Sequence, residues 1–254
     1  MARTIEALTA FGLAGRGFLL SLNSPQMKPF LPTLLAGLAL SAAAPAPYPS
    51  AKAKPEALFN GKTTQGWHTY LQPTVTPAWS VVDGALQLDP AAAGQGDLVT
   101  DGEYENFELA LEWKIAEGGN SGIIFGVHED PAFQATYDTG VEMQVLDDKS
   151  ASDNKKPSRR AGSLYDMLPP AHDVVKPAGE WNRVKLRKDR GHLTFWLNGT
   201  QTVDVQMGSP KWQKLLADSK FKDWKNFAAY PKGHIALQDH GAKVSYRDIM
   251  LTPL

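Results

Sequence analysis

Side chains that can transfer protons alternate with apolar residues in two segments of the sequence. In the segment GVEMQVLDD, Glu142 and Gln144 fall on one face of a predicted strand and the apolar residues on the other. In the segment HIALQDH, Gln238 and His240 fall opposite the apolar residues in the same way. A carboxylate and an imidazole can act as acid or base, and amides can bind sugar hydroxyls. The alternative for each residue is a solvated strand face, so a shared polar floor requires the two strands to lie in one sheet.

Glycines leave part of another predicted strand bare. The segment GGNSGIIFGV places Asn120, Gly122 and Gly126 on the face opposite its core residues. A strand face without side chains lets a ligand or another backbone approach closely. A β-bulge or a sheet crossing that needs glycine for its geometry explains the same pattern. Both interpretations stand at this point.

Two loop segments add cations and aromatic residues. The segment SRRAGSLY contains Arg160 and Tyr165, and the turn KPAGEWN contains Lys176. Loop cations are commonly just solvated, which is the alternative for both. Trp181 and Trp196 alternate with polar neighbours, and we interpret them as a cover for the outer face of a sheet rather than as sugar-stacking platforms.

The acidic residues could serve as a pair of catalytic carboxylates or as metal ligands. Glu142 and Asp147 are five residues apart, so they point to opposite faces and lie ~17 Å apart along a strand. That spacing argues against a pair of glycosidase acids. Together with His240 these acids would suit Ca²⁺, Mn²⁺ or Zn²⁺ if the strand twisted or bulged near Leu146. Sequence signatures of zinc proteases, serine hydrolases and phosphate loops are absent.

The composition narrows the function classes. The 254 residues include no cysteine, which excludes disulfides, thiolate metal sites and cysteine nucleophiles. A net charge of −1 without charged runs gives no sign of nucleic-acid binding or of an anionic membrane partner. The oligomeric state is not indicated by the sequence.

The N-terminal segment is typical of an export signal. Residues 27–44 contain one lysine, a short apolar run and a small-residue cleavage site, as a secretory signal peptide does. The apolar run is shorter than the ~20 residues that span a bilayer. We interpret residues 1–26 as an over-long start and residues 45–55 as a flexible leader. The mature protein is expected to be periplasmic or extracellular, without an integral membrane segment.

The remaining residues, 56–254, predict a single all-β domain. Short alternating segments are separated by glycine, proline, asparagine and aspartate, and Asp83-Gly84 and Asn198-Gly199 indicate tight hairpins. The expected strands are 79–82, 85–88, 106–115, 121–127, 141–147, 181–188, 192–197, 201–206, 234–239 and 243–251. One helix is expected within 209–226. This pattern predicts a two-sheet jelly-roll sandwich of the concanavalin A type, with one short helix.

Seven motifs in order resemble one known family. They are LFNGKTTQGW, GNSGIIF, VEMQVLD, AGSLYDMLPP, KPAGEWN, WLNG and GHIALQDHGAKVSYRDI. Across residues 56–254 the chain is similar to the 3-keto-disaccharide hydrolase family, exported proteins that cleave glycosides oxidised at C3 of the sugar. The resemblance implies a concanavalin-like fold. It also implies the site residues Asn120, Glu142, Gln144, Asp147, Tyr165, Gln238 and His240.

A C3 ketone implies a mechanism that differs from ordinary glycoside hydrolysis. The ketone acidifies the C2 proton and makes the C1 oxygen a leaving group, so elimination followed by hydration gives net hydrolysis. His240 or Glu142 is the expected base, and Lys176, Arg160 or a divalent cation would stabilise the enolate. Gln144, Asn120 and Gln238 would hold hydroxyls of the small carbohydrate substrate, and Tyr165 would protonate the leaving group. The alternatives are a non-catalytic carbohydrate-binding module and an envelope interaction protein.

Overall fold

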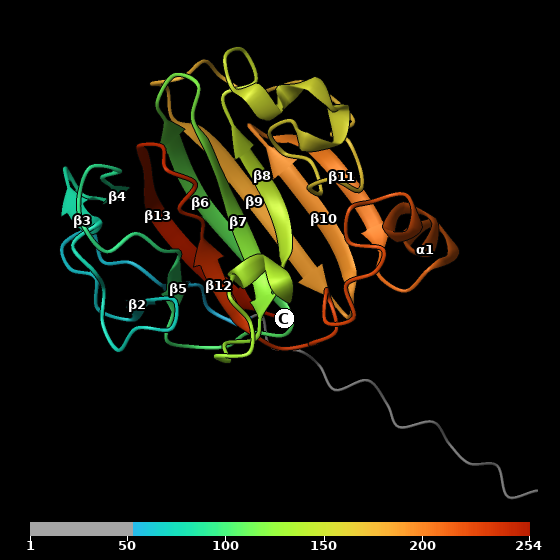
Figure 1. Ribbon diagram of the computed structural model, residues 1–254, viewed down its shortest axis with the longest axis horizontal. Helices are drawn as coiled ribbons and strands as arrows, with labels where there is room; N and C mark the ends of the chain where they lie inside the picture. Colours follow the sequence, from blue (N-terminus) through green and yellow to red (C-terminus); the bar gives the residue numbers. More distant parts are fainter. Residues whose placement is uncertain (1–52) are drawn as a thin grey trace, which may run out of the picture. The chain divides into compact units, whose positions relative to one another are not determined.

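Two antiparallel sheets form the fold of the computed structural model, which describes residues 53–254 (Figure 1). The larger sheet has the order β11 (Thr200–Gln206), β10 (His192–Leu197), β9 (Asn182–Asp189), β6 (Phe107–Ile115), β13 (Val244–Pro253), β4 (Ala85–Leu88) and β3 (Trp79–Val82), with β1 (Glu56–Ala57) beside β13. The smaller sheet has the order β2 (Trp67–Thr69), β5 (Leu98–Thr100), β12 (His234–Leu237), β7 (Asn120–Val127) and β8 (Val141–Leu146). The predicted two-sheet jelly roll with one short helix is confirmed. The expectations for residues 1–26, 27–44 and most of the leader fall outside the described residues.

The core lies between the two sheets because each contributes an alternating apolar face. Strand β6 buries every second residue, beginning with Phe107, while the residues between them stay partly exposed. From the smaller sheet, the ring of Phe125 meets those of Phe107 and Phe195 edge to face, at centroid distances of 6.2 and 6.1 Å. These aromatic contacts hold the smaller sheet in place, with the face of Glu142 turned away from the main core.

The two bare glycines of β7 have different explanations. At Gly126 the pairing with β12 slips, because Val127 pairs with His234 whereas Phe125 pairs with Ile235. Gly126 has φ +71°, which favours glycine, so the bulge interpretation is confirmed there. Gly122 lies in regular pairing opposite Gln144. A methyl group at Gly122 would collide with the Glu142 carboxyl, so the group that approaches this glycine is that side chain.

The helix is shorter than predicted, and three 3₁₀ helices and three short strands were not foreseen. Helix α1 (Pro210–Ala217) starts at the Ser209 cap and lies beside β11 (Figure 1). The helical hydrogen bonding does not continue past Ser219, because the backbone N–H of Lys220 donates to Asp166 and that of Phe221 to the Ser219 side chain. Among the described residues no helix is long and apolar enough to cross a membrane.

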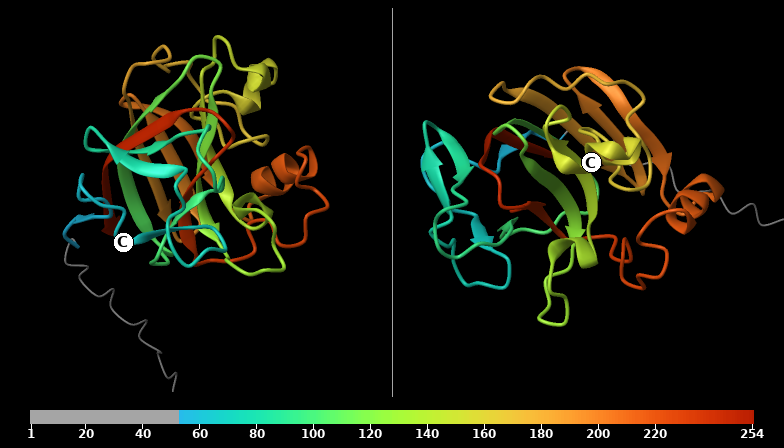
Figure 2. Two further views of the ribbon diagram at one scale, coloured as in Figure 1. Left: turned by 60° about the vertical axis from the view of Figure 1, so that its left-hand side comes forward. Right: turned by 45° about the horizontal axis from the view of Figure 1, so that its top comes forward.

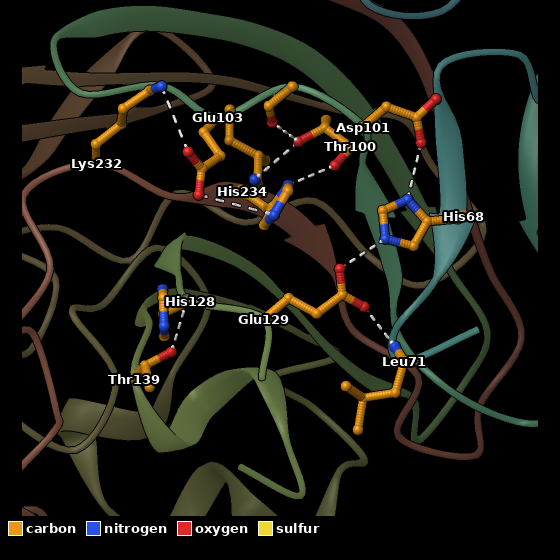
Figure 3. A network of polar contacts seen from close by, with 12 residues as sticks. His68, Leu71, Thr100, Asp101, Glu103, His128, Glu129, Thr139, Lys232 and His234 are labelled. Atoms are coloured by element: carbon orange, nitrogen blue, oxygen red, sulfur yellow. Dashed lines mark hydrogen bonds and ion pairs between the residues drawn. The ribbon is translucent and has the colours of Figure 1, made fainter. Parts of the chain in front are cut away.

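Loops next to the smaller sheet complete the domain. The 3₁₀ helix η1 (Thr136–Asp138) lies between β7 and β8, and η2 (Ser152–Lys155) and η3 (Pro157–Arg159) follow β8. The chain from η2 to residue 168 runs alongside β8, where it is seen in yellow (Figure 2). The loop after β7 is fixed by Glu129, which binds His68 of β2 and the amide of Leu71 (Figure 3). Both loops therefore have defined positions beside the sheet.

Candidate active site

A pocket of about 480 Å³ opens on the face of the smaller sheet that points away from the core. It draws side chains from β7 and β8, from η1, and from the segments after η3, α1 and β12. The lining residues are Asn120, Tyr137, Glu142, Tyr165, Lys220, Trp224, Gln238, Asp239 and His240. Five of the predicted site residues, Asn120, Glu142, Tyr165, Gln238 and His240, therefore meet around one cavity.

Strand order brings the sheet residues together. Strand β7 lies between β8 and β12, and the backbone N–H of Gln238 donates to the backbone carbonyl of Gly122 on β7. The side chain of Glu142 on β8 packs against the same glycine. Asn120 begins β7, and its buried side-chain oxygen has no hydrogen-bond partner among the described residues. An unpartnered polar atom beside a cavity is suited to a polar ligand.

Glu142 is the buried acid on the floor of this pocket. Only 6% of its surface is exposed, and no hydrogen bond from the described residues stabilises its carboxylate. Burial raises the pKa of Glu142 to about 8, and the charges of Asp97 and Asp153 act in the same direction. The Lys220 ammonium opposes the rise. Glu142 can therefore exchange a proton near neutral pH.

Lys220 faces a set of aromatic rings. Its Nζ lies 4.5 Å from the ring centre of Tyr165, 5.6 Å from that of Tyr137 and 5.8 Å from that of Trp224. Burial of the ammonium lowers the pKa of Lys220, although the charge of Glu142 opposes this. The residue as a whole remains exposed, so a molecule in the pocket can reach its amine.

Tyr165 belongs to a hydrogen-bonded group behind the pocket. Its hydroxyl donates to Asp153 at 2.9 Å, and burial together with that contact raises the pKa of Tyr165. Arg159 donates to both Asp153 and Asp166. Asp166 also accepts the backbone N–H of Lys220, so it links the Tyr165 wall to the Lys220 loop.

Asp97 joins two other walls of the pocket. Its carboxylate accepts the Asp239 N–H at 2.8 Å and the Thr136 hydroxyl, next to Tyr137. Burial raises the pKa of Asp97 to about 6. Asp239 itself accepts the N–H groups of Gly96 and Gly241. His240, exposed at the rim, follows directly.

Four of the predicted site residues lie elsewhere. The Gln144 amide, buried under the loop after η3, donates to the carbonyl of Arg159. Arg160 pairs with Asp173 at 2.9 Å and lines a different cavity. Lys176 donates from Nζ to the carbonyl of Trp181. Asp147 accepts the N–H groups of Gly118 and Lys149, which makes it a turn-stabilising residue.

The proposed metal ligands do not converge. Asp147 lines a separate cavity with Arg160 and Lys176, whereas Glu142 and His240 line the main pocket. Within residues 53–254 no group of three or more histidine, aspartate or glutamate side chains has the arrangement of a metal site. The ligands predicted from the sequence, Glu142, Asp147 and His240, therefore do not form a cation site together. A requirement for Ca²⁺, Mn²⁺ or Zn²⁺ stays a prediction, and removal of metal with a chelator would test it.

Sequence reasoning missed the cation and the aromatic walls of the site. Lys220 and Trp224 come from the loop after α1, and Tyr137 comes from the short 3₁₀ helix η1, so none of them belongs to an alternating strand pattern. One signal was available: the segment SKFKDWKNF places charges among aromatic residues just beyond the helix, where a continuous amphipathic helix would separate them.

The chain is similar to proteins of known sequence and structure. Residues 54–252 match the family described as the 3-keto-alpha-glucoside-1,2-lyase-like domain. A 3-keto-disaccharide hydrolase of Bacteroides thetaiotaomicron is 32% identical over 224 residues, covering 78% of this chain and 77% of that protein. A crystal structure from Parabacteroides distasonis, provisionally described as a glycosyl hydrolase, matches with a TM-score of 0.73 and 31% identity, covering 79% of this chain and 94% of that one. A second structure from that organism has a TM-score of 0.61 and 30% identity, covering 79% and 100%.

Proposed function

The chain belongs to the family of 3-keto-alpha-glucoside-1,2-lyase-like domains and is a hydrolase, and from this premise we propose that it cleaves glycosides whose sugar carries a ketone at C3. The observation that supports the proposal most is the buried acid Glu142, which shares a pocket with the amine of Lys220. Such a pair suits proton removal next to a carbonyl group.

The proposed reaction begins at the C2 proton, which the ketone makes acidic. Its removal leaves an electron pair that is shared with the C3 carbonyl. The pair then forms the C1=C2 double bond while the C1–O bond breaks, and the leaving oxygen takes up a proton. Water adds to C1 and a proton returns to C2, so the sum of the steps is hydrolysis.

Glu142 is the base that we propose for the C2 proton. With a pKa of about 8 its carboxylate is a stronger base than an ordinary glutamate, and no hydrogen bond from the described residues occupies it. Asp239, the other carboxylate that lines the pocket, already accepts two backbone N–H groups. A base works best when its pKa lies near the working pH, which favours Glu142.

The other pocket residues would bind and orient the sugar. The side chains of Asn120 and Gln238 can hydrogen-bond hydroxyls, and the Tyr137 and Trp224 rings offer apolar faces for a sugar ring. Lys220 supplies positive charge for the C3 end. We assign the proton for the leaving oxygen to His240 at the rim rather than to Tyr165, because the Tyr165 hydroxyl already donates to Asp153 and its raised pKa makes it a weak acid.

The alternative of a non-catalytic sugar-binding module explains the aromatic rings and the amides equally well. It gives no reason for a carboxyl group that is buried without a hydrogen bond, because such a group costs stability. The two functions differ in turnover, which can be measured directly.

The test is release of 3-keto-glucose from 3-keto-glucosides by the purified protein, with Glu142→Gln compared with wild type. Loss of the base should lower kcat by ~10²-fold or more. Exchange of the C2 proton of 3-keto-glucose in heavy water should fall equally in Glu142→Gln, yet persist in His240→Ala if His240 acts only on the leaving group. Glu180→Gln, at an exposed turn, is the matched control.

The pH profile separates a base from an acid at position 142. With Glu142 as base, kcat/KM should rise with pH through about 8, because the carboxylate must be ionised. A fall through the same range would assign Glu142 as the acid instead. No release of sugar by the wild-type protein from any 3-keto-glucoside would refute the proposed function.

A further inference from the structure

Within residues 53–254, the amine of Lys220 has no acidic partner in contact. Its pKa responds to Glu142, Asp166 and Asp153 only through space, and no hydrogen bond from the described residues involves the amine. The other cations beside the pocket differ: Arg159 binds Asp153 and Asp166, and Lys156 binds Asp166. Among these neighbours the Lys220 amine is the one left for a ligand.

The position of Lys220 is fixed although its amine is free. Its backbone N–H donates to Asp166 at 2.8 Å, and the next residue, Phe221, is buried with its ring stacked on that of Phe227. The side chain extends from this anchor over the Tyr165 ring, with Nζ 4.5 Å from the ring centre. The amine therefore lies at a defined place in the pocket wall, in the same cavity as Glu142.

A free lysine amine beside a ketone has a reaction open to it that a fixed positive charge does not. Amines condense with ketones, and lysines in apolar surroundings are the ones that do so in enzymes, because loss of hydration disfavours the ammonium form. The lowered pKa of Lys220 agrees with this chemistry. The aromatic faces attract the ammonium, so the free amine forms from a charged resting state.

We propose that Lys220 forms a covalent imine with the C3 ketone of the substrate, placed within reach of Glu142 by the shared pocket. The proposal rests on the proposed function for the ketone substrate. In this role Lys220 acts as a nucleophile, whereas the proposed function needs only its positive charge near C3 of the sugar. The protonated imine draws electrons more strongly than the ketone and so acidifies the C2 proton further.

The steps balance without an oxidant or a reductant. Nζ adds to the C3 carbon and the carbonyl oxygen leaves as water, giving a protonated imine. Glu142 takes the C2 proton, and the electron pair moves toward nitrogen as an enamine. The enamine expels the C1 substituent, which takes up one proton. Water adds to C1, a proton returns to C2, and a second water molecule releases the sugar and frees Lys220.

The test is reductive trapping of the imine on the whole protein. Wild type is incubated with 3-keto-glucose and cyanoborohydride, digested and mapped by mass spectrometry. The peptide with Lys220 should gain the mass of the sugar less one oxygen atom, and faster than peptides with other exposed lysines such as Lys62. Lys220→Arg keeps the charge but cannot form the imine, so its cleavage rate should fall as far as that of Lys220→Met, by ~10²-fold or more.

The outcomes separate this proposal from the proposed function. Preferential labelling of Lys220, with both variants inactive and unfolding at the wild-type temperature, supports the imine. Labelling of Lys220 no faster than that of exposed lysines, or cleavage by Lys220→Arg within tenfold of wild type, overturns it and leaves a role for charge alone. Trapping uses 3-keto-glucose itself and does not depend on cleavage, whereas failure to cleave any 3-keto-glucoside refutes the proposed function separately.

Discussion

At the residue scale, Glu142 and Lys220 shift one another's pKa through their charges, and each is also shifted by its own partial removal from water. Burial favours the neutral form of both groups, whereas their mutual attraction favours the charged forms. Burial dominates for both, since the pKa of Glu142 is raised and that of Lys220 is lowered. The protonation of each group therefore depends on that of the other, and a bound ketone would shift both.

The first prediction concerns the stability cost of burying Glu142. Its folded-state pKa of about 8 exceeds the ordinary value of 4.5, so the unfolded chain releases this proton first as the pH rises. Stability should therefore fall between about pH 4.5 and 8. Glu142→Gln should remove that loss and stabilise the protein by about 1–4 kcal/mol at pH 8 but little at pH 4, since one pKa unit corresponds to about 1.4 kcal/mol. Thermal unfolding at both pH values measures it.

The matched control for this experiment is Glu180→Gln, because Glu180 is exposed. The control should shift the melting temperature equally at the two pH values. A Glu142→Gln variant that is no more stable than wild type at pH 8 would show that the carboxyl is better solvated than its 6% exposure indicates.

The sequence predicted the strand-borne residues of the site and failed on the loop-borne ones. Glu142, Gln238 and Asn120 follow from alternation, which fixes the face of a strand residue. Gln144 shares the face of Glu142 yet is covered by the loop after η3, a contact that no local pattern encodes. The sequence predicts Arg160 or Lys176 as the cation of the pocket, whereas the structure places Lys220 there. The path of its loop depends on tertiary contacts, such as the hydrogen bond from the Lys220 N–H to Asp166, which no local pattern reveals.

At the scale of elements, the bare face of β7 makes room for the acid of β8. Gly122→Ala is the second prediction. A methyl group there would collide with a carboxyl oxygen of Glu142, so the flexible end of that side chain must move. We expect a loss of stability of only ~1 kcal/mol, since Gly122 has no positive φ that would strain alanine, and a fall in kcat of ~10-fold or more.

A double-mutant cycle checks that Gly122 acts through Glu142. Activity of Gly122→Ala/Glu142→Gln should equal that of Glu142→Gln alone, because the displaced group is already gone. Additive losses in the double variant would mean that Gly122 matters for another reason, such as direct contact with the sugar.

Asp97 connects η1 with the turn after β12, which is the third prediction. Asp97→Ala would leave the partly buried Asp239 N–H and the hydroxyl of the buried Thr136 without an acceptor, at a cost of ~1–3 kcal/mol. Activity should fall as well, because Tyr137 and His240 flank the two donors. Urea unfolding and the cleavage rate measure the two effects. Glu105→Ala, an exposed carboxylate, is the control, and equal stability of the two variants would contradict the role of Asp97.

The predicted bounds of individual strands are correct where the alternation of apolar residues and the residues of the adjoining turn indicate the same end point. Strands β3 and β4 match the expected bounds around the Asp83-Gly84 turn, and β10 matches beside Asn198-Gly199. Strands β2 and β5 were missed because three residues are too few to show alternation. The helix was overestimated because apolar spacing continues to Phe221, although the backbone amides there bond to side chains.

At the scale of the whole domain, one cross-strand row joins two polar sites across the smaller sheet. Directly paired residues share a face, and the row reads His68, Val99, Ala236, Ile124 and Glu142. Val99, Ala236 and Ile124 belong to a small apolar cluster outside the main core. His68 thus lies at the opposite edge of the face that carries the pocket, roughly 19 Å away at about 4.8 Å per strand.

The last prediction concerns this edge. His68 is held between Asp101 and Glu129, each at 2.8 Å (Figure 3). Its desolvation lowers its pKa, but the hydrogen bonds and charges of the two carboxylates outweigh that, so the pKa is raised. His234 lies edge-on at 6.0 Å, and Glu103 and Lys232 lie beyond it. A raised pKa adds stability below the unfolded value of about 6.5, and this is lost as the pH rises through the folded value.

His68→Gln should therefore remove a pH-dependent part of the stability. The glutamine keeps a donor for one carboxylate but cannot titrate, so its melting temperature should lie below that of wild type at pH 6, with a smaller difference at pH 8.5. His192→Gln is the matched control, because His192 pairs with Asp204 at an exposed site. If both variants follow the wild-type pH dependence, His68 does not hold the loop after β7 through its charge. If only His68→Gln departs from it, the far edge of the sheet fixes the loop that carries Tyr137 into the pocket.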